Sequence, residues 1–426
     1  MASHKNIFVY WDSLSGGCPP ELLGILSVQL SRGKEVFSFE FDDGFLTRHP
    51  NQCLDPQLQM YHGPQFSEKG NFGLFLDSSP DRWGRKLMLR REALRAARAH
   101  ERPRALLESD FLLGVYDESR MGALRFKLSP EGNFVNEDQQ IAVPPWTRLR
   151  ELEEASLHLE NEEPSTDHEK WLATLLAPGS SLGGARPKAS VLSPQGELWI
   201  AKFPRKNDDW NTSAWEYTVS IMARDAGLKM PECRLEQFSP NGATFLTKRF
   251  DRRGKQRVHF ASTMTMLGKT DGDDATSGVS YLDIAEWIMQ NDASPQDDLR
   301  ELWRRIVFSM AVSNTDDHLR NHGFLLEKDG WHLSPAYDLN PNPQGTGLAL
   351  NVSLDDNRLD FDLARETAPF FRLNHAETES IIAKVCSVVR NWRSYARRVG
   401  LAVSEQDVLA SAFSLAEHEL KSNLEL

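Results

Sequence analysis

The order of strand-like and helix-like patterns constrains this chain more than any other feature of its sequence. Short segments between turn signals fill residues 188–250, and long amphipathic helical patterns dominate from about residue 251 onward. Before them, residues 5–46 alternate like three short strands, residues 80–100 are typical of a basic helix, and a further strand-like segment begins at Gly122. We therefore expect an α+β fold with a mixed β/α subdomain at 1–165, a strand-rich lobe at 166–250 and a larger helical lobe at 251–426.

Composition narrows the class of protein. The formal net charge of -12 argues against a chain that coats nucleic acid along its whole length. The sequence contains no run of 18 apolar residues, and its first residues turn polar too early for a signal peptide. The cysteines are scattered without a CxxC pair, which favours a reducing compartment over a disulfide framework or a zinc site. We expect a cytoplasmic protein without a membrane span.

The segment S-N-T-D-D-H-L-R-N (313–321) carries the strongest chemical signal. Asp316 and Asn321 have the D-x-x-x-x-N spacing of a kinase catalytic loop. A carboxylate at the first position can accept a hydroxyl proton, and an amide oxygen at the second can bind a metal ion. Asp338 follows after a strand-like W-H-L-S-P and offers a second metal ligand. This set of residues predicts phosphoryl transfer. Together with the order of a strand-rich lobe and a larger helical lobe, it predicts a bilobal protein-kinase-like fold.

A glycine-containing segment, S-L-G-G-A-R-P-K (181–188), is suited to wrap phosphates, although it lacks the Walker pattern and is by itself more typical of an ordinary turn. Lys202 follows on a predicted strand, where a lysine needs a partner. Glu216 on the next predicted helix is one candidate for an ion pair with Lys202. The alternative is that Glu216 closes a capping box with Ser213.

Two other patterns remain open at this point. His318 and His322 stand four residues apart, which suggests zinc, but no cysteine or H-E-x-x-H pattern accompanies them. The basic helix at 82–98 distributes its cations around much of its circumference. It fits a solvated face, or alternatively a surface for nucleic acid or an acidic partner.

Taken together, the motifs resemble those of the HipA kinases, the toxins of bacterial type II toxin–antitoxin pairs, over most of the chain. The most specific shared segments are S-L-G-G-A-R-P-K (181–188), I-A-K-F-P (200–204), R-F-D-R-R (249–253), N-T-D-D-H-L-R-N (314–321) and Y-D-L-N-P (337–341). The family loop usually reads T-D-G-H-x-K-N, whereas here Asp317 replaces the glycine and Arg320 the lysine. We expect catalysis to survive these changes, with Asp317 adding negative charge beside the phosphates.

The resemblance implies a role for each matching residue. Asp316 would be the catalytic residue, Asn321 and Asp338 would hold Mg²⁺, and Ser181 would be a site of autophosphorylation that switches the kinase off. Lys248 and Phe250 would lie in the hinge beside adenine, where the family often has Glu in place of Lys248. The ATP-binding residues implied in this way are Leu182, Gly183, Gly184, Ala185, Lys188, Lys202, Lys248, Phe250, His318, Asn321, Tyr337 and Asp338.

The same resemblance implies partners and leaves alternatives. It implies a helix-turn-helix antitoxin of HipB type, operator DNA reached through that antitoxin, and a protein substrate such as an aminoacyl-tRNA synthetase. Two other functions remain: a kinase of the same broad fold that acts on a small molecule, and a catalytically weak or inactive corepressor that acts with an antitoxin on DNA. The Asp316, Asn321 and Asp338 set favours an ATP- and Mg²⁺-dependent serine/threonine protein kinase.

Overall fold

The chain divides into two compact units, described here each by itself. Unit 1 contains residues 1–206 and 251–261, and unit 2 contains residues 207–250 and 262–426. In the computed structural model the described residues are 4–12, 19–68, 70–136, 143–160, 175, 184 and 186–424. The expected segment 166–250 is thus divided between the units at residue 206, and a short segment after residue 250 returns to unit 1.

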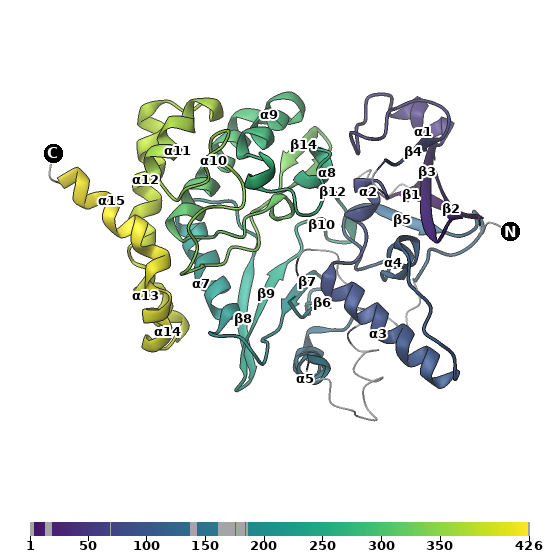
Figure 1. Cartoon of the computed structure of the whole chain (residues 1–426), viewed down its shortest axis with the longest axis horizontal. Helices are drawn as coiled ribbons and strands as arrows, with labels where there is room; N and C mark the ends of the chain where they lie inside the picture. Colours follow the sequence, from purple (N-terminus) through teal and green to yellow (C-terminus); the bar gives the residue numbers. More distant parts are fainter. Residues whose placement is uncertain are drawn as a thin grey trace. The chain divides into compact units, whose positions relative to one another are not determined.

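Unit 1 is built on an antiparallel sheet with the strand order β4-β3-β2-β1-β5 (Figure 1, purple to blue). Its strands are β1 (His4–Trp11), β2 (Glu21–Ser31), β3 (Lys34–Phe41), β4 (Gln65–Phe66) and β5 (Leu124–Lys127). Alternate residues of β3 are buried, which is the pattern expected of a strand with one face on a core. On that face Phe39 contacts Phe75 with ring centroids 5.4 Å apart. The strands predicted within residues 5–46 are confirmed.

Helices and two strand pairs complete unit 1. They are α1 (Asp43–Arg48), α2 (Gly73–Leu76), α3 (Arg82–Arg98), α4 (Glu108–Gly114), α5 (Leu149–Glu160), β6 (Lys188–Leu192) with β7 (Leu198–Lys202), and β10 (Arg252–Arg253) with β11 (Gln256–Arg257). The basic helix α3 begins after Asp81, whose carboxylate accepts a hydrogen bond from the Gly84 amide. Several of its arginines pair with acids of unit 1, such as Arg85 with Glu108 at 2.6 Å, so this face is partly neutralised.

Unit 2 is mostly helical, and several of its elements pack around the long helix α10 (Pro295–Ala311). Its other helices are α7 (Thr212–Asp225), α8 (Thr263–Met266), α9 (Tyr281–Asn291), α11 (Phe361–Thr367), α12 (His375–Val389), α13 (Trp392–Val399), α14 (Val403–Val408) and α15 (Ser414–Leu424). Two antiparallel hairpins belong to it, β8 (Cys233–Ser239) with β9 (Gly242–Lys248), and β13 (Gly323–Glu327) with β14 (Gly330–Leu333). Strand β12 (His259–Ser262) lies where the chain passes from unit 1 into unit 2.

The core of unit 2 is aromatic at its centre. Trp392 stacks on Phe413 with ring centroids 4.5 Å apart, and Trp215 of α7 lies 6.0 Å from each of them. Burying three such rings removes several hundred Å² of apolar surface from water and holds α7 against the C-terminal helices. Helix α7 begins after Asn211, which accepts a hydrogen bond from the Ala214 amide. The alternative capping box of Ser213 with Glu216 is therefore wrong, because the helix starts before Ser213.

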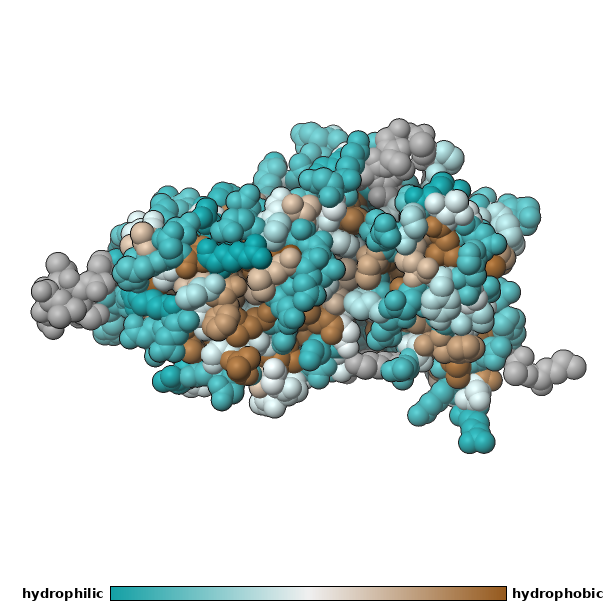
Figure 2. Space-filling view, turned by 90° about the horizontal axis from the view of Figure 1, so that it is seen from above, coloured by the Kyte–Doolittle hydropathy of each residue, from teal (hydrophilic) through white to brown (hydrophobic). Residues whose placement is uncertain are grey.

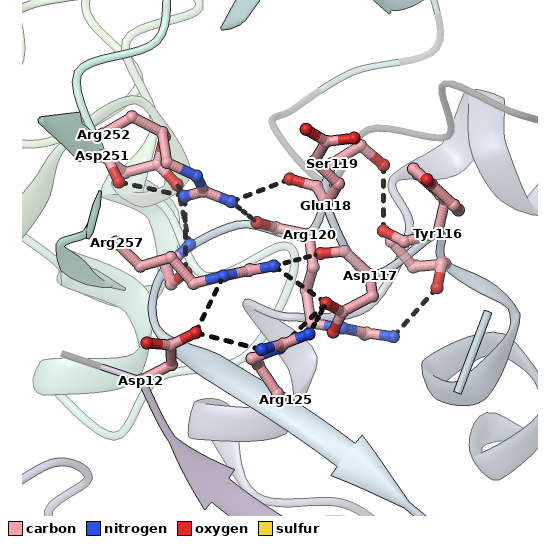
Figure 3. Close-up of polar contacts among 12 residues, drawn as sticks. Asp12, Tyr116, Asp117, Glu118, Ser119, Arg120, Arg125, Asp251, Arg252 and Arg257 are labelled. Carbon is pink, nitrogen blue, oxygen red and sulfur yellow. Dashed lines mark hydrogen bonds and ion pairs between the residues drawn. The ribbon is translucent and has the colours of Figure 1, made fainter. Parts of the chain in front are cut away.

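A network of arginines and aspartates joins two distant segments within unit 1 (Figure 3). Asp251 accepts hydrogen bonds from the Gly122 amide at 2.8 Å and from Arg252 at 2.6 Å. Arg252 in turn donates to the backbone carbonyl of Arg120 at 2.7 Å. Two sequence segments thus meet through Asp251 and Arg252. They are G-A-L-R-F, which begins at Gly122, and R-F-D-R-R, which begins 127 positions later at Arg249.

The same network continues to Asp117, which lies between two guanidinium groups. Its carboxylate is 2.7 Å from Arg125 and 3.1 Å from Arg257. Asp12 is a second, more exposed carboxylate near the same two arginines. Burial lowers the pKa of Arg257 and lowers that of Arg120 to about 9, because a charged guanidinium loses hydration in the interior.

Polar and charged side chains cover most of the surface seen in Figure 2, and apolar side chains form smaller groups between them. Among the helices of the described segments, none combines the length and the apolar character that a membrane crossing requires.

Candidate functional site

The site is centred on the loop between α10 and β13, which we call the catalytic loop (residues 313–322). It leaves α10 through Ser313, whose φ of 50° lies in the left-handed region. A short 3₁₀ turn at Leu319–Asn321 then leads into β13. The neighbouring turn supports the loop from outside, because Asn340 donates its amide to Asn314 at 3.1 Å and Asn342 donates to Thr315 at 2.8 Å.

Asn321 has its two amide atoms in different environments. Its Nδ2 donates to the backbone carbonyl of Asp316 at 2.8 Å, which fixes the side chain across the loop. Its Oδ1 is buried and has no hydrogen-bond partner among the described residues. A buried amide oxygen without a donor costs free energy unless something else satisfies it. An oxygen in this state fits the ligand set of Mg²⁺, which prefers carboxylate and carbonyl oxygens.

Asp338 has strained backbone geometry. Its φ is 60°, in the left-handed region that residues other than glycine seldom adopt. Asn340 donates to its Oδ1 at 3.3 Å. Strain of this kind is concentrated at functional sites, where the surrounding structure holds it in place. Asn321 and Asp338 each carry an oxygen of the kind that a magnesium ion could bind.

Asp316 and Asp317 are adjacent but point to different environments. Asp316 is exposed at the surface of the loop. Asp317 is 2% exposed, accepts a hydrogen bond from the Tyr281 hydroxyl at 2.7 Å, and lies 3.1 Å from Nε2 of His322. The expectation that Asp317 adds negative charge beside the phosphates is wrong, because its carboxylate is turned into the interior of unit 2.

The electrostatics of Asp317 follow from these neighbours. Burial by itself raises the pKa of Asp317, but the nearby His322 and hydrogen bonds from His322 and Tyr281 bring it below the ordinary value. Burial, and next the charge of Asp317, raise the pKa of Tyr281 well above its usual range, so its hydroxyl remains a donor. His322 is therefore part of an internal brace with Asp317. Over the described residues, neither His318 nor His322 belongs to a group of three or more His, Cys, Asp or Glu side chains close enough to hold one metal ion.

Tyr337 and Phe250, both implied to contact the nucleotide, lie side by side. Their ring centroids are 5.5 Å apart, and the Tyr337 hydroxyl donates to the carbonyl of Arg320 at 2.7 Å. Lys248 ends β9, and its amide donates to the carbonyl of Glu232 at 2.8 Å. His318 precedes the 3₁₀ turn with its Nδ1 buried and unpaired among the described residues. Unit 2 thus brings Phe250 and Tyr337 together at the catalytic loop.

The predicted phosphate-binding lysines lie in unit 1. Lys188 and Lys202 are directly opposite each other in the β6–β7 hairpin, so both side chains leave the same face. Lys188 also forms a buried ion pair with Asp81 at 2.8 Å. Gly184 has a φ of 84°, which glycine adopts without strain. Ser181, Leu182, Gly183 and Ala185 lie outside the described residues.

The fold and the catalytic loop define the class: this is an α+β protein with a protein-kinase-like fold. Its fold is similar to that of HipA in a Shewanella oneidensis complex of HipA, HipB and their operator DNA. The TM-score is 0.66 at 16% sequence identity, over 97% of each chain. Residues 180–392, half of the chain, match the family model of the HipA-like C-terminal domain. The chain belongs to the HipA family.

Curated relatives match a shorter part of the chain. A Haemophilus influenzae protein named "Putative kinase" is 29% identical over an alignment of 189 residues that covers 39% of this chain and 54% of that protein. "Putative kinase Y4mE" of Sinorhizobium fredii is 26% identical over an alignment of 182 residues that covers 37% of this chain and 41% of that protein. The matches thus span about half of the length of these relatives.

Proposed function

We propose that this chain is an ATP- and Mg²⁺-dependent serine/threonine protein kinase, the toxin of a HipA-type toxin–antitoxin pair. The observation that carries the proposal is the geometry of the catalytic loop. One side chain, Asn321, is fixed with a buried acceptor oxygen still unsatisfied, and it bonds to the backbone of Asp316, whose carboxylate is exposed. A loop built in this way suits a metal-bound phosphate on one side and an incoming hydroxyl on the other.

In the proposed reaction the acceptor hydroxyl oxygen forms a bond to the γ-phosphorus while the bond from that phosphorus to the bridging oxygen of ADP breaks. Asp316 accepts the hydroxyl proton. Magnesium held by Asn321 and Asp338 would neutralise charge on the phosphate oxygens. Lys188 and Lys202 are proposed to bind phosphates, and Phe250 and Tyr337 to pack against the base. The buried brace of Asp317 holds the loop in place from within.

The test is a comparison of phosphoryl transfer and ATP binding in the wild type and in Asp316→Asn. We expect the variant to lose transfer while retaining ATP affinity, because a proton acceptor acts on the barrier rather than on ground-state binding. Calorimetry should also show weak ATP binding without Mg²⁺ and tight binding with it. Transfer at the wild-type rate by the variant would contradict the role of Asp316, and equal ATP affinity with and without Mg²⁺ would contradict those of Asn321 and Asp338.

The finer features belong to the same proposal. The Shewanella complex of HipA, HipB and operator DNA supports an antitoxin of HipB type as partner, together with DNA. That the antitoxin is a helix-turn-helix protein through which the chain reaches DNA rests on the family resemblance. Autophosphorylation at Ser181, an aminoacyl-tRNA synthetase as substrate and a cytoplasmic location rest on the family resemblance. Mass spectrometry after incubation with Mg-ATP tests Ser181. A phosphate on neither Ser180 nor Ser181 would remove that site from the proposal.

A further inference from the structure

A second cluster of metal-ligating side chains lies in unit 2, away from the catalytic loop in sequence. Asp292 follows the last residue of α9, Asp298 lies in the first turn of α10, and His332 is in β14. One donor atom from each of the three lies within 4.8 Å of the other two. The backbone already joins these elements, because the Ala293 amide donates to the carbonyl of Trp331 at 2.8 Å.

Hydrogen bonds fix both carboxylates and still leave acceptor capacity on one oxygen of each. Oδ1 of Asp292 accepts from the Ser294 amide at 2.7 Å, whereas its Oδ2 is buried and has no hydrogen-bond partner among the described residues. Asp298 is 0% exposed. Its Oδ1 accepts from Lys229 and its Oδ2 from the Leu333 amide, both at 2.8 Å. A carboxylate oxygen accepts two hydrogen bonds, so Oδ2 of Asp298 keeps a lone pair.

The imidazole of His332 is oriented from outside the cluster. Its Nε2 lies 3.0 Å from Oδ1 of Asp329, an exposed acid at the turn before β14. In a neutral imidazole the proton shared with that carboxylate lies on Nε2, and Nδ1 then carries the lone pair that a metal ligand needs. Nδ1 faces Oδ2 of Asp298 at 3.9 Å, too far for a hydrogen bond. Carboxylate–histidine pairs of this kind orient imidazole ligands in many metal sites.

The separations and the donor chemistry select the kind of ion. Two ligands that each bind one ion at about 2.1 Å stand roughly 3–4 Å apart, which suits the 3.9 Å gap between His332 and Asp298. One imidazole nitrogen with two carboxylate oxygens favours a first-row transition metal over Mg²⁺ or Ca²⁺, which prefer all-oxygen sites. Lys229 neutralises one of the two carboxylates, and its half-exposed side chain can move to make room.

We propose that Asp292, Asp298 and His332 form a structural site for a divalent transition-metal ion, with Zn²⁺ as the best-suited ion. Oδ2 of Asp292, Oδ2 of Asp298 and Nδ1 of His332 are the ligand atoms, and water completes the coordination. The site joins the α9–α10 connection to β14, the strand that leads to Asp338. It is separate from the proposed Mg²⁺ site and stands whether or not the chain is a kinase.

The experiment uses the full chain, stripped with a chelator and titrated with ZnCl₂ or MnCl₂ in the absence of nucleotide. We expect one tightly bound Zn²⁺ per chain and a rise in Tm on binding, both lost in Asp292→Asn and in His332→Gln. His375→Gln removes an exposed histidine of α12 outside the cluster and should behave as the wild type. Asp338→Asn should also keep the site, which separates this result from any failure of the kinase proposal.

Asp329→Asn provides a test that does not disturb the interior, because this side chain is 70% exposed. Loss of the partner of Nε2 should weaken Zn²⁺ binding by about 10–100-fold while the apo protein keeps its Tm. If Asp292 and Asp298 instead share a proton, the wild type should show no metal-dependent change in Tm, and this result would overturn the site. A metal-dependent rise in Tm that persists in the Asp292 and His332 variants would also overturn it.

Discussion

Two buried aspartates, Asp117 in unit 1 and Asp317 in unit 2, show two ways of stabilising a loop with charge. They are 3% and 2% exposed, respectively. Asp117 lies between the guanidinium groups of Arg125 and Arg257, at 2.7 Å and 3.1 Å. Asp317 instead faces a tyrosine hydroxyl and an imidazole. The first arrangement is a permanent ion-pair network, and the second is a smaller brace beneath a loop that has to present Asp316 to solvent.

The difference has a physical reason. In unit 1 the network joins segments more than 120 positions apart in the chain, so several bonds are needed to offset the entropy of closing that loop. In unit 2 the chain itself already connects Asp316, Asp317 and His322 within a few residues. One carboxylate is enough to fix the direction in which the loop faces. We expect the two aspartates to respond differently to the same substitution.

The largest effect is expected for Asp117→Asn. Removing one charge from a buried network leaves Arg125 and Arg257 partly uncompensated, which costs on the order of 3–5 kcal/mol of unfolding free energy. Denaturant unfolding measures the loss, and native-state hydrogen exchange should locate it in unit 1. Asp12→Asn, at the more exposed edge of the network, is the matched control and should cost about 1 kcal/mol. Equal effects of the two substitutions would contradict the central position of Asp117.

Asp317→Asn should destabilise less but reduce phosphoryl transfer more. The amide still accepts from the Tyr281 hydroxyl, but the carboxylate charge beside His322 is lost, so we expect a stability loss of about 3 kcal/mol or less. Transfer should fall because the catalytic loop loses its internal support, while ATP affinity stays close to that of the wild type. Initial rates and calorimetry on the same preparations separate the two. If Asp117→Asn reduces transfer as strongly at equal fractions of folded protein, the proposed division of labour is wrong.

A third experiment asks whether burial in unit 1 makes the protein sensitive to acid. Burial lowers the pKa of His259 from 6.5 to about 3. The unfolded chain therefore binds a proton that the folded chain does not, and the contribution of His259 to stability, present above pH 6.5, falls as the pH drops below it. Between pH 7 and pH 5 the loss is about 2 kcal/mol. The pH dependence of unfolding should become flatter by this amount in His259→Asn and stay unchanged in His375→Asn.

The smallest effect is expected for Gly345→Ala, because Gly345 lies very close to the catalytic loop. A Cβ at position 345 would lie 2.3 Å from Cγ2 of Thr315, the residue before Asp316. Gly345→Ala should therefore displace Thr315 and lower transfer severalfold, with a stability loss of about 1 kcal/mol. Gly254 in unit 1 has a φ of 61° and no atom within 4 Å of an added Cβ, so Gly254→Ala should lower stability through backbone strain while leaving transfer unchanged. Unchanged transfer in Gly345→Ala would show that Thr315 can move freely.

The parts of this protein that the sequence predicted are those in which neighbours in the chain carry the signal. The alternation in β3 and the amphipathic period of α7 report burial directly, so these elements were found. The D-x-x-x-x-N spacing identified Asp316 and Asn321, because the whole loop is contiguous. The short strands β10 to β13 were missed, since two to five residues carry too little periodicity to separate them from the helices around them, whereas β14 coincides with the strand-like W-H-L-S-P.

Only the tertiary structure decided which of two adjacent aspartates is exposed at the surface and which is buried in the core. Asp316 and Asp317 are identical in chemistry, and only the position of Tyr281 and His322 turns the second one inward. In the same way, no local pattern joins Asp292, Asp298 and His332, or Asp251 and Gly122. The sequence by itself determined the elements and the catalytic loop through short-range periodicity and spacing. Long-range pairing of buried polar groups depends on how the chain folds back on itself, and this only the folded structure decides.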